Sequence, residues 1–300
     1  MRMMKFLIKF FVTVFLLLVV FNFIEHDKFI SNIFKLNLNN FFGLFLIIFF
    51  SLLFNFLRLK LMITKIFNLK ISNLRVFSIF SFSMGLSQLP LFGGQELYKY
   101  YDISKITNHK ELSAYTVIIE RLSGLVINIF FLVISCTFLI KIYFEEFFFY
   151  YFFVLFLILF FFTFFFRKII YRVSYLNYIF QYVKYNTLNI REIFFKISLY
   201  SFIIQILSLY LGYYCLSLFM EVKFIILTII VLQLANIILA LPISFAGIGL
   251  RDIVYIFLIG LIDNFSANDV ASSTMLINFS VLISILTLVT INLVFFRNKS

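Results

Sequence analysis

Long apolar runs alternate with short polar connections along the whole chain. Crossing a hydrocarbon core of about 30 Å takes about 20 helical residues, and six runs reach that length without interruption: residues 6–24, 40–57, 114–140, 147–166, 197–219 and 268–296. The basic start and the first run imitate a secretory signal, but the following FNFIEHDKF lacks a small-residue cleavage pattern. We expect that run to be retained, and the pattern predicts an all-α, polytopic bundle of membrane helices with about six full spans.

Two further apolar stretches are interrupted, residues 72–90 by Pro90 and residues 224–262 by Pro242. Broken segments that enter a membrane from opposite faces are typical of inverted repeats, and they usually mark the binding site of a transporter. LPLFGGQELYKYY and LPISFAGIGLRDIVYIF echo one another weakly, and one long span follows each. We therefore expect one integral membrane domain over residues 1–300, with half-repeats at about 40–140 and 197–296.

The charges of the connections indicate how the bundle is oriented, because basic connections are expected on the cytoplasmic side. If the N-terminus is cytoplasmic and only the six full spans cross, two segments of net charge +5, residues 58–75 and 167–196, lie inside. The neutral and acidic connections at residues 25, 141 and 220 then lie outside. This parity requires the stretch around Pro90 to enter from the cytoplasm and the one around Pro242 from outside. We expect a multi-pass protein of the cytoplasmic, or inner, membrane with both termini cytoplasmic.

Composition excludes a soluble protein, since 64% of the residues are hydrophobic and only 13% are charged. The formal charge of +12 lies in a few short connections, so it indicates membrane orientation rather than binding of nucleic acid. Cys136 and Cys215 stand inside apolar runs, where small core residues are expected rather than a disulfide or a metal site. We expect no metal and no cofactor, and the sequence does not indicate the oligomeric state.

The first candidate site is SQLPLFGGQELYKYY, residues 87–101. Pro90 removes a backbone donor, and Gly93 and Gly94 permit conformations closed to other residues, so a helix must break here. Such a break is tolerated at membrane depth only where protein or a water-filled cavity satisfies the exposed backbone. Glu96 and Lys99 follow three positions apart, on one face of the resuming helix. The alternative is a cytoplasmic turn with a solvated ion pair.

The second candidate site is Glu120 with Arg121, which stand about two turns inside an otherwise apolar span. Charges at this depth tend to face the bundle interior and to pair with each other or with a ligand. Adjacent helical residues point in different directions, so the two cannot satisfy one another and at least one should find a partner on another element. The alternative is a pair of charges that reach back to the cytoplasmic interface.

The third candidate site is ALPISFAGIGLRD, residues 240–252. Pro242, Gly247 and Gly249 loosen the backbone before Arg251 opens a short helix. The free amides of a helix start and an arginine fork together suit a phosphate. We therefore expect Arg251 to contact the phosphate of a ligand.

Together these motifs resemble the lysylphosphatidylglycerol synthase transmembrane, or flippase-like, family. The resemblance runs over almost the whole chain in the order Pro90, Gly94-x-Glu96-x-x-Lys99, Glu120-Arg121-Leu122 and PISFAGIGLRD. It implies an integral membrane protein that handles anionic or polyprenyl-phosphate lipids. Fused members add a soluble aminoacyl-transferase domain, but the polar stretches of this chain reach only about 30 residues, too few for an enzyme core. We expect no lipid aminoacylation by this chain alone.

Residue by residue, the resemblance places Glu96, Glu120, Arg121 and Arg251 at family positions. Lys99 stands where arginine is usual, Asp252 replaces a glutamate, Gly124 stands where an acidic residue is common, and Asn278 lies near a frequent arginine. These departures bear on the substrate more than on the fold. We include Lys99, Asp252 and Asn278 among the expected lipid-binding residues.

The leading hypothesis is a lipid translocase without catalytic residues, in which Arg121, Arg251 and Lys99 hold a lipid phosphate and Glu96 and Glu120 orient those cations or relay protons. The rival from another class is a membrane-embedded glycosyltransferase that uses a polyprenyl-phosphate sugar. It rests on Glu25, His26 and Asp27, an acidic pair around a histidine in the first outward connection. A non-transporting assembly partner of a cell-envelope complex is a third alternative.

Overall fold

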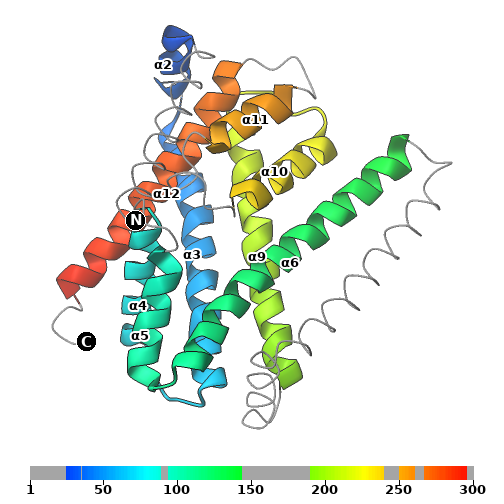
Figure 1. The fold of residues 1–300 in the computed structure, drawn as a ribbon. Coiled ribbons are helices and arrows are strands. Elements are labelled where there is room, and N and C mark those ends of the chain that lie inside the picture. The colour runs from blue at the N-terminus through cyan, green and yellow to red at the C-terminus, as the bar shows by residue number, and fades with distance from the viewer. Residues whose placement is uncertain are drawn as a thin grey trace, which may run out of the picture.

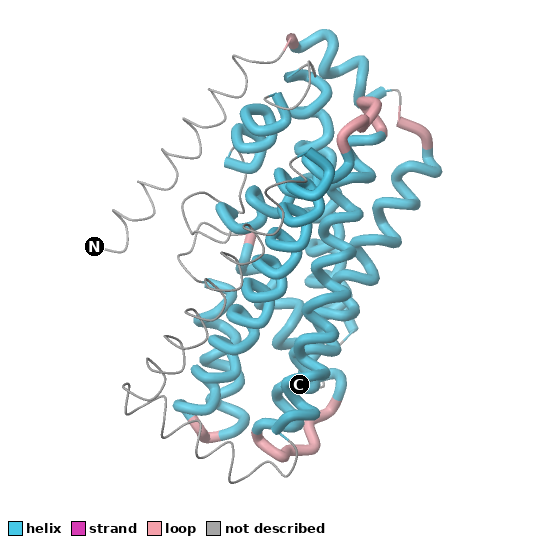
Figure 2. Tube along the Cα trace, turned by 90° about the vertical axis from the view of Figure 1, so that its right-hand side faces the viewer, coloured by secondary structure: helices cyan, strands magenta, loops and turns pink. Residues whose placement is uncertain are grey.

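The computed structural model describes residues 25–34, 36–88, 94–143, 190–239, 250–260 and 267–295, and these form nine helices (Figure 1). Their bounds are as follows: α2 His26–Phe34, α3 Leu38–Ile66, α4 Asn73–Ser87, α5 Gly94–Thr107, α6 Lys110–Tyr143, α9 Ile190–Ser217, α10 Ile225–Leu239, α11 Leu250–Gly260 and α12 Ala267–Phe295. Figure 2 shows most of the described loops gathered at the two ends of an elongated bundle.

Four helices are long and apolar enough to cross a membrane: Leu38–Ile66, Lys110–Lys141, Ile193–Ser217 and Ala267–Val294. They correspond to four of the six predicted spans, while the predicted spans 6–24 and 147–166 lie outside the described residues. Large apolar side chains, such as Phe49 and Phe130, are about half exposed on the outer faces. Such faces suit lipid rather than water. The prediction of an all-α, polytopic membrane protein is confirmed.

Helix α3 is longer than predicted. The predicted span ends at residue 57, because Arg58 and Lys60 were counted as charges of a cytoplasmic loop. Instead the helix continues to Ile66, and Leu59, Ile63 and Ile66 are buried at helical spacing. Arg58 is therefore a buried residue of a transmembrane helix.

The two interrupted stretches form two pairs of short helices. Ser72 caps α4, because its side chain accepts a hydrogen bond from the backbone amide of Arg75 at 3.3 Å. Helices α4 and α5 pack together at the lower end of Figure 1, and α10 and α11 pack together in the upper half. The predicted break residues Pro90, Gly93, Pro242, Gly247 and Gly249 lie outside the described residues, and Gly94 begins α5.

Two antiparallel helices, α3 and α9, pack against each other in the middle of the bundle. The helices α3, α4, α5 and α6 correspond in order to α9, α10, α11 and α12, and corresponding helices make corresponding contacts. The contact of α4 with α12 matches that of α10 with α6, the contact of α5 with α6 matches that of α11 with α12, and the contact of α3 with α4 matches that of α9 with α10. Each half has the order long, short, short, long. This is the packing expected of an inverted repeat, and the half-repeats themselves stay a prediction.

The buried apolar residues form separate clusters along α3 and α9. One cluster includes Leu44, Leu216 and Leu232, and another includes Leu59, Ile79 and Ile103. On α3 the polar residues Ser51, Asn55 and Arg58 lie between the members of the two clusters. The apolar packing therefore leaves a polar section in the middle of the bundle.

Gly212 lets α9 and α10 approach closely. A Cβ atom at this position would stand 2.7 Å from Leu232 Cδ2, and Leu232 is only 1% exposed. Gly212→Ala should lower stability, because overpacking by about 1–3 kcal/mol exceeds the gain in helix propensity of about 1 kcal/mol. The measurement is folded protein remaining after heating in detergent, followed by size-exclusion chromatography. Gly124→Ala is the control, since its Cβ would meet Arg58 Nη1 at an ordinary 3.9 Å; equal behaviour of the two variants would contradict close packing at Gly212.

Candidate functional site

Three charged residues from three helices meet inside the bundle. Lys99 Nζ of α5 donates to Glu120 Oε1 of α6 at 2.7 Å, and Arg58 Nη2 of α3 donates to the same oxygen at 3.4 Å. The residues are 3%, 6% and 7% exposed for Lys99, Glu120 and Arg58. We call these three residues the charged cluster.

Arg58 is held by α9 as well. Its Nη1 donates to Ser201 Oγ at 3.0 Å, and its Nη2 donates to Asn55 Oδ1 at 3.1 Å. Ser201 Oγ donates in turn to Ser123 Oγ of α6 at 3.1 Å. Arg58 Nε is buried and makes no hydrogen bond within the described part of the chain. The Nε donor of the guanidinium therefore remains for a further acceptor.

The charged cluster carries more positive than negative charge. Two cations share one carboxylate, so its formal net charge is +1. Charge inside a membrane is costly, and it is retained where it pairs with another group or faces a ligand or water. An anionic group beside Arg58 would balance the surplus charge and fill the open donor. The arrangement suits a phosphate.

The prediction that at least one of Glu120 and Arg121 pairs with another element is confirmed, and in the structure both residues do so. Glu120 points to Lys99 and Arg58, whereas Arg121 forms an ion pair with Glu96 of α5. That second pair is more accessible, since the Arg121 side chain is 54% exposed and that of Glu96 is 23% exposed. The structure thus divides the predicted residues into a buried group and an accessible pair.

Polar residues continue from the charged cluster along the contact between α3 and α9. Ser51, Asn55 and Arg58 repeat at helical spacing on α3, and Ser201, Gln205 and Ser208 do so on α9. Seven residues of helix correspond to about 10 Å. A polar track therefore runs from the charged cluster for about a third of a hydrocarbon core of about 30 Å.

Buried amides join this track from the neighbouring helices. Gln205 Nε2 lies 2.9 Å from Asn128 Oδ1 of α6 and 3.0 Å from Gln233 Oε1 of α10. Asn236, one turn further along α10, donates from Nδ2 to Ser208 Oγ at 3.4 Å. Gln233 is fully buried, and its Nε2 makes no hydrogen bond within the described residues. The interior thus presents amide and hydroxyl groups from four helices.

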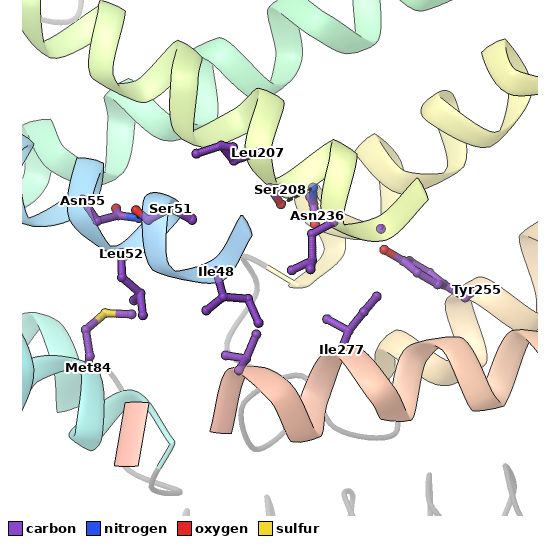
Figure 3. A pocket seen from close by; sticks show the side chains of 13 residues that line it. Ile48, Ser51, Leu52, Asn55, Met84, Leu207, Ser208, Asn236, Tyr255 and Ile277 are labelled. Atoms are coloured by element: carbon purple, nitrogen blue, oxygen red, sulfur yellow. Dashed lines mark hydrogen bonds between the residues drawn. The ribbon is translucent and has the colours of Figure 1, made fainter. Parts of the chain in front are cut away.

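A cavity of about 180 Å³ opens at the upper end of the track (Figure 3). Asn55 lines it and also accepts the hydrogen bond from Arg58, so the cavity adjoins the charged cluster. Its described lining comes from α3, α4, α9, α10, α11 and α12: Ile48, Ser51, Leu52, Asn55, Met84, Leu207, Ser208, Leu211, Gly212, Asn236, Tyr255, Ile277 and Val281.

The remaining predicted residues lie close to this lining in sequence without belonging to it. Asp252 is buried on α11 one turn before Tyr255, and Asn278 is half-buried on α12 beside Ile277. Arg251 is the second residue of α11, but its side chain lies outside what the structure describes. The predicted contact of Arg251 with a phosphate stays a prediction.

Sequence reasoning missed Arg58, Asn55, Gln205 and Gln233. Arg58 was counted as a loop charge, although the apolar periodicity of α3 continues past it. The signal available was the spacing of Ser51, Asn55 and Arg58 on one face of an otherwise apolar helix.

The fold and the site define a class, a polytopic helical membrane protein with a charged cluster and an adjoining cavity in its interior. The family model described as the lysylphosphatidylglycerol synthase TM region matches residues 6–294. The chain belongs to this family, which makes it a membrane protein of lipid or cell-envelope metabolism. No curated protein and no solved structure matches the chain.

Proposed function

We propose that this protein is a lipid translocase that moves an anionic phospholipid or a polyprenyl-phosphate-linked lipid between the leaflets of the membrane. The observation that carries the proposal is the charged cluster, with its surplus positive charge and the open Nε donor of Arg58 beside a cavity. A lipid phosphate supplies both the missing charge and the missing acceptor. Family membership supports a lipid as the ligand.

The contact distances suggest how the phosphate enters. Glu120 holds Lys99 at 2.7 Å and Arg58 at only 3.4 Å, so Arg58 is the cation that a phosphate takes over more readily. Lys99 then keeps Glu120 neutralised. The accessible pair Glu96–Arg121 lies on the same two helices and is available to receive the head group on its way to the interior.

The pairs α4–α5 and α10–α11 provide a basis for alternating access. They lie toward opposite ends of the bundle, and the helices of one half make contacts that correspond to those of the other half. In transporters with inverted repeats, one half rocks against the other around a central site. Arg251, Asp252 and Asn278 belong to the half formed by α9–α12 and lie close in sequence to Tyr255 or Ile277 of the cavity lining. We propose that they act on the lipid from that side.

The proposed location is the cytoplasmic, or inner, membrane, with the N- and C-termini in the cytoplasm. The end of α3, with Lys65, and the loop that follows it, with Lys70, lie at the lower end of Figure 1 together with the start of α9 and its exposed Lys196. Basic residues at one end support a cytoplasmic assignment of that end.

The test is leaflet exchange in reconstituted vesicles of mixed anionic and zwitterionic lipid. Tail-labelled phosphatidylglycerol and tail-labelled phosphatidylcholine are compared, and label in the outer leaflet is destroyed by a membrane-impermeant reductant. We expect the protein to accelerate exchange of the anionic lipid well above that of the zwitterionic lipid. Exchange of both lipids at the rate of protein-free vesicles would contradict the proposal.

Replacing a residue of the acidic pair Glu25 and Asp27 distinguishes the glycosyltransferase alternative from the translocase. Glu25 and Asp27 are both exposed at the start of α2. Asp27→Asn should leave leaflet exchange unchanged, and exchange should not depend on a divalent metal. Metal-dependent sugar transfer that disappears in Asp27→Asn would favour the enzyme instead.

A further inference from the structure

The cavity has a chemical character different from that of the charged cluster. The polar residues of its described lining are Ser51, Asn55, Ser208, Asn236 and Tyr255, all of which present neutral hydroxyl or amide groups. In Figure 3 the Tyr255 hydroxyl points toward Asn236, across from the side chains of α3. Hydroxyls and amides both donate and accept hydrogen bonds, so this lining is matched by a ligand that does the same.

The size of the cavity limits what it can hold. At about 30 Å³ for each water molecule, a volume of about 180 Å³ has room for roughly six waters. A glycerol or a single sugar ring fits this space, whereas a pair of acyl chains does not. Its described lining contains no carboxylate, the partner that a buried cationic head group needs.

The cavity lies next to Arg58, the residue proposed to bind the lipid phosphate. Asn55 contacts Arg58 on one side and lines the cavity on the other. A group esterified to a phosphate at Arg58 therefore extends along the polar track into the cavity. Gln233, with its open Nε2 donor, lies one helical turn from Asn236 and lengthens the amide-rich wall.

We propose that the cavity binds the neutral, hydroxyl-rich part of a lipid head group, a glycerol or a sugar, while Arg58 holds the phosphate that carries it. This inference rests on the proposed function for the lipid as ligand and for the phosphate at Arg58, but not for movement of the lipid between leaflets. It assigns the specificity of the site to Asn236, Tyr255 and Ser208 rather than to charge. The protein should therefore distinguish lipids of equal charge by their hydroxyl groups.

The test is competition binding to the detergent-purified protein, measured by native mass spectrometry. Phosphatidylglycerol competes with phosphatidylmethanol of identical acyl chains, because both carry one phosphodiester charge and only the first carries hydroxyls. We expect a preference of about 10-fold for phosphatidylglycerol, the effect of about one net hydrogen bond. A second arm compares a polyprenyl-phosphate hexose with the bare polyprenyl phosphate and separates a sugar from a glycerol as the preferred group.

Two variants locate the preference in the cavity. Asn236→Leu should remove the preference and keep binding of phosphatidylmethanol, and Tyr255→Phe, which only loses a hydroxyl, should weaken the preference. Asn292→Leu is the control, because it replaces an asparagine that is buried more deeply than Asn236 but bonds to Ser81 of α4 outside the cavity. It should keep the preference.

The possible outcomes distinguish failure of the head-group inference from failure of the translocase function. Equal binding within both lipid pairs, or a preference that survives in Asn236→Leu, overturns the head-group inference. A retained preference without leaflet exchange in vesicles leaves the inference standing and removes the translocase function. Phosphatidylcholine also carries a phosphate, but its head group is cationic and has no hydroxyl. Equal binding of phosphatidylglycerol and phosphatidylcholine therefore removes both the selection for an anionic lipid and the head-group preference, and with them both proposals.

Discussion

Replacement of Glu120 by glutamine should reduce the free energy of unfolding by about 3–5 kcal/mol, because it leaves two buried cations without their carboxylate. The formal charge of the cluster then rises from +1 to +2 at an unchanged side-chain size. The chain contains no tryptophan, so far-UV circular dichroism during heating in detergent is the suitable measurement. Glu96→Gln is the control and should change stability by about 1 kcal/mol or less, because its pair with Arg121 is accessible to solvent.

A double variant tests whether charge is the cause. Lys99→Met combined with Glu120→Gln returns the cluster to a formal charge of +1, now on Arg58 alone. It should recover most of the stability that Glu120→Gln loses. If Glu120→Gln is as stable as the wild type, or if the double variant is the less stable of the two, the charged cluster does not have the energetics described above.

Replacement of Arg58 by methionine should abolish most of the lipid exchange while the protein stays folded. The change removes the surplus charge and leaves the Lys99–Glu120 pair at 2.7 Å intact. Three hydrogen bonds, to Ser201, Asn55 and Glu120, are lost, but an apolar side chain of similar length suits a buried site. Hydrogen bonds to a charged group contribute about 1.5–3 kcal/mol, so anionic-lipid exchange should fall by about 10- to 100-fold. Arg58→Lys should be intermediate, because lysine keeps the charge without the fork.

A comparison with Arg121→Met shows whether the lipid phosphate binds at Arg58, as the structure indicates, or at Arg121, as the sequence predicts. Arg121 was predicted to hold the phosphate, yet its side chain is half exposed and already paired with Glu96. Arg121→Met should therefore reduce exchange less than Arg58→Met does. The reverse order, measured in the same vesicles at equal amounts of folded protein, would place the phosphate at the accessible pair instead.

Much of the architecture could be predicted from the sequence, because the hydrocarbon core imposes strong rules on composition and length. The uninterrupted runs at 114–140 and 268–296 became α6 and α12 with small changes at their ends. Helix α4 ends at Ser87, shortly before the predicted break at Pro90, whereas the predicted break at Pro242 lies outside the described residues. Glu120 stood out because a carboxylate is rare inside an apolar span, and its need for a partner on another helix followed from the directions of adjacent side chains.

The partners themselves could not be predicted, since they depend on which helices pack together. Arg58 is 62 positions from Glu120 in the chain, and the contact between α3 and α9 brings Ser201 to Arg58 from 143 positions away. Arg58 also lies near the end of its apolar run, where an arginine is equally compatible with a loop. Only its burial inside α3 distinguishes the two, and burial comes from tertiary structure.

The most direct test of the central claim is an experimental structure of the protein in a lipid nanodisc that contains an anionic lipid. We expect a lipid phosphate within hydrogen-bond distance of Arg58, at about 3 Å from a guanidinium nitrogen, with its head group extending toward Asn236. A lipid phosphate bound at Glu96 and Arg121 alone, or an interior filled only by acyl chains while Arg58 keeps its present partners, would contradict it.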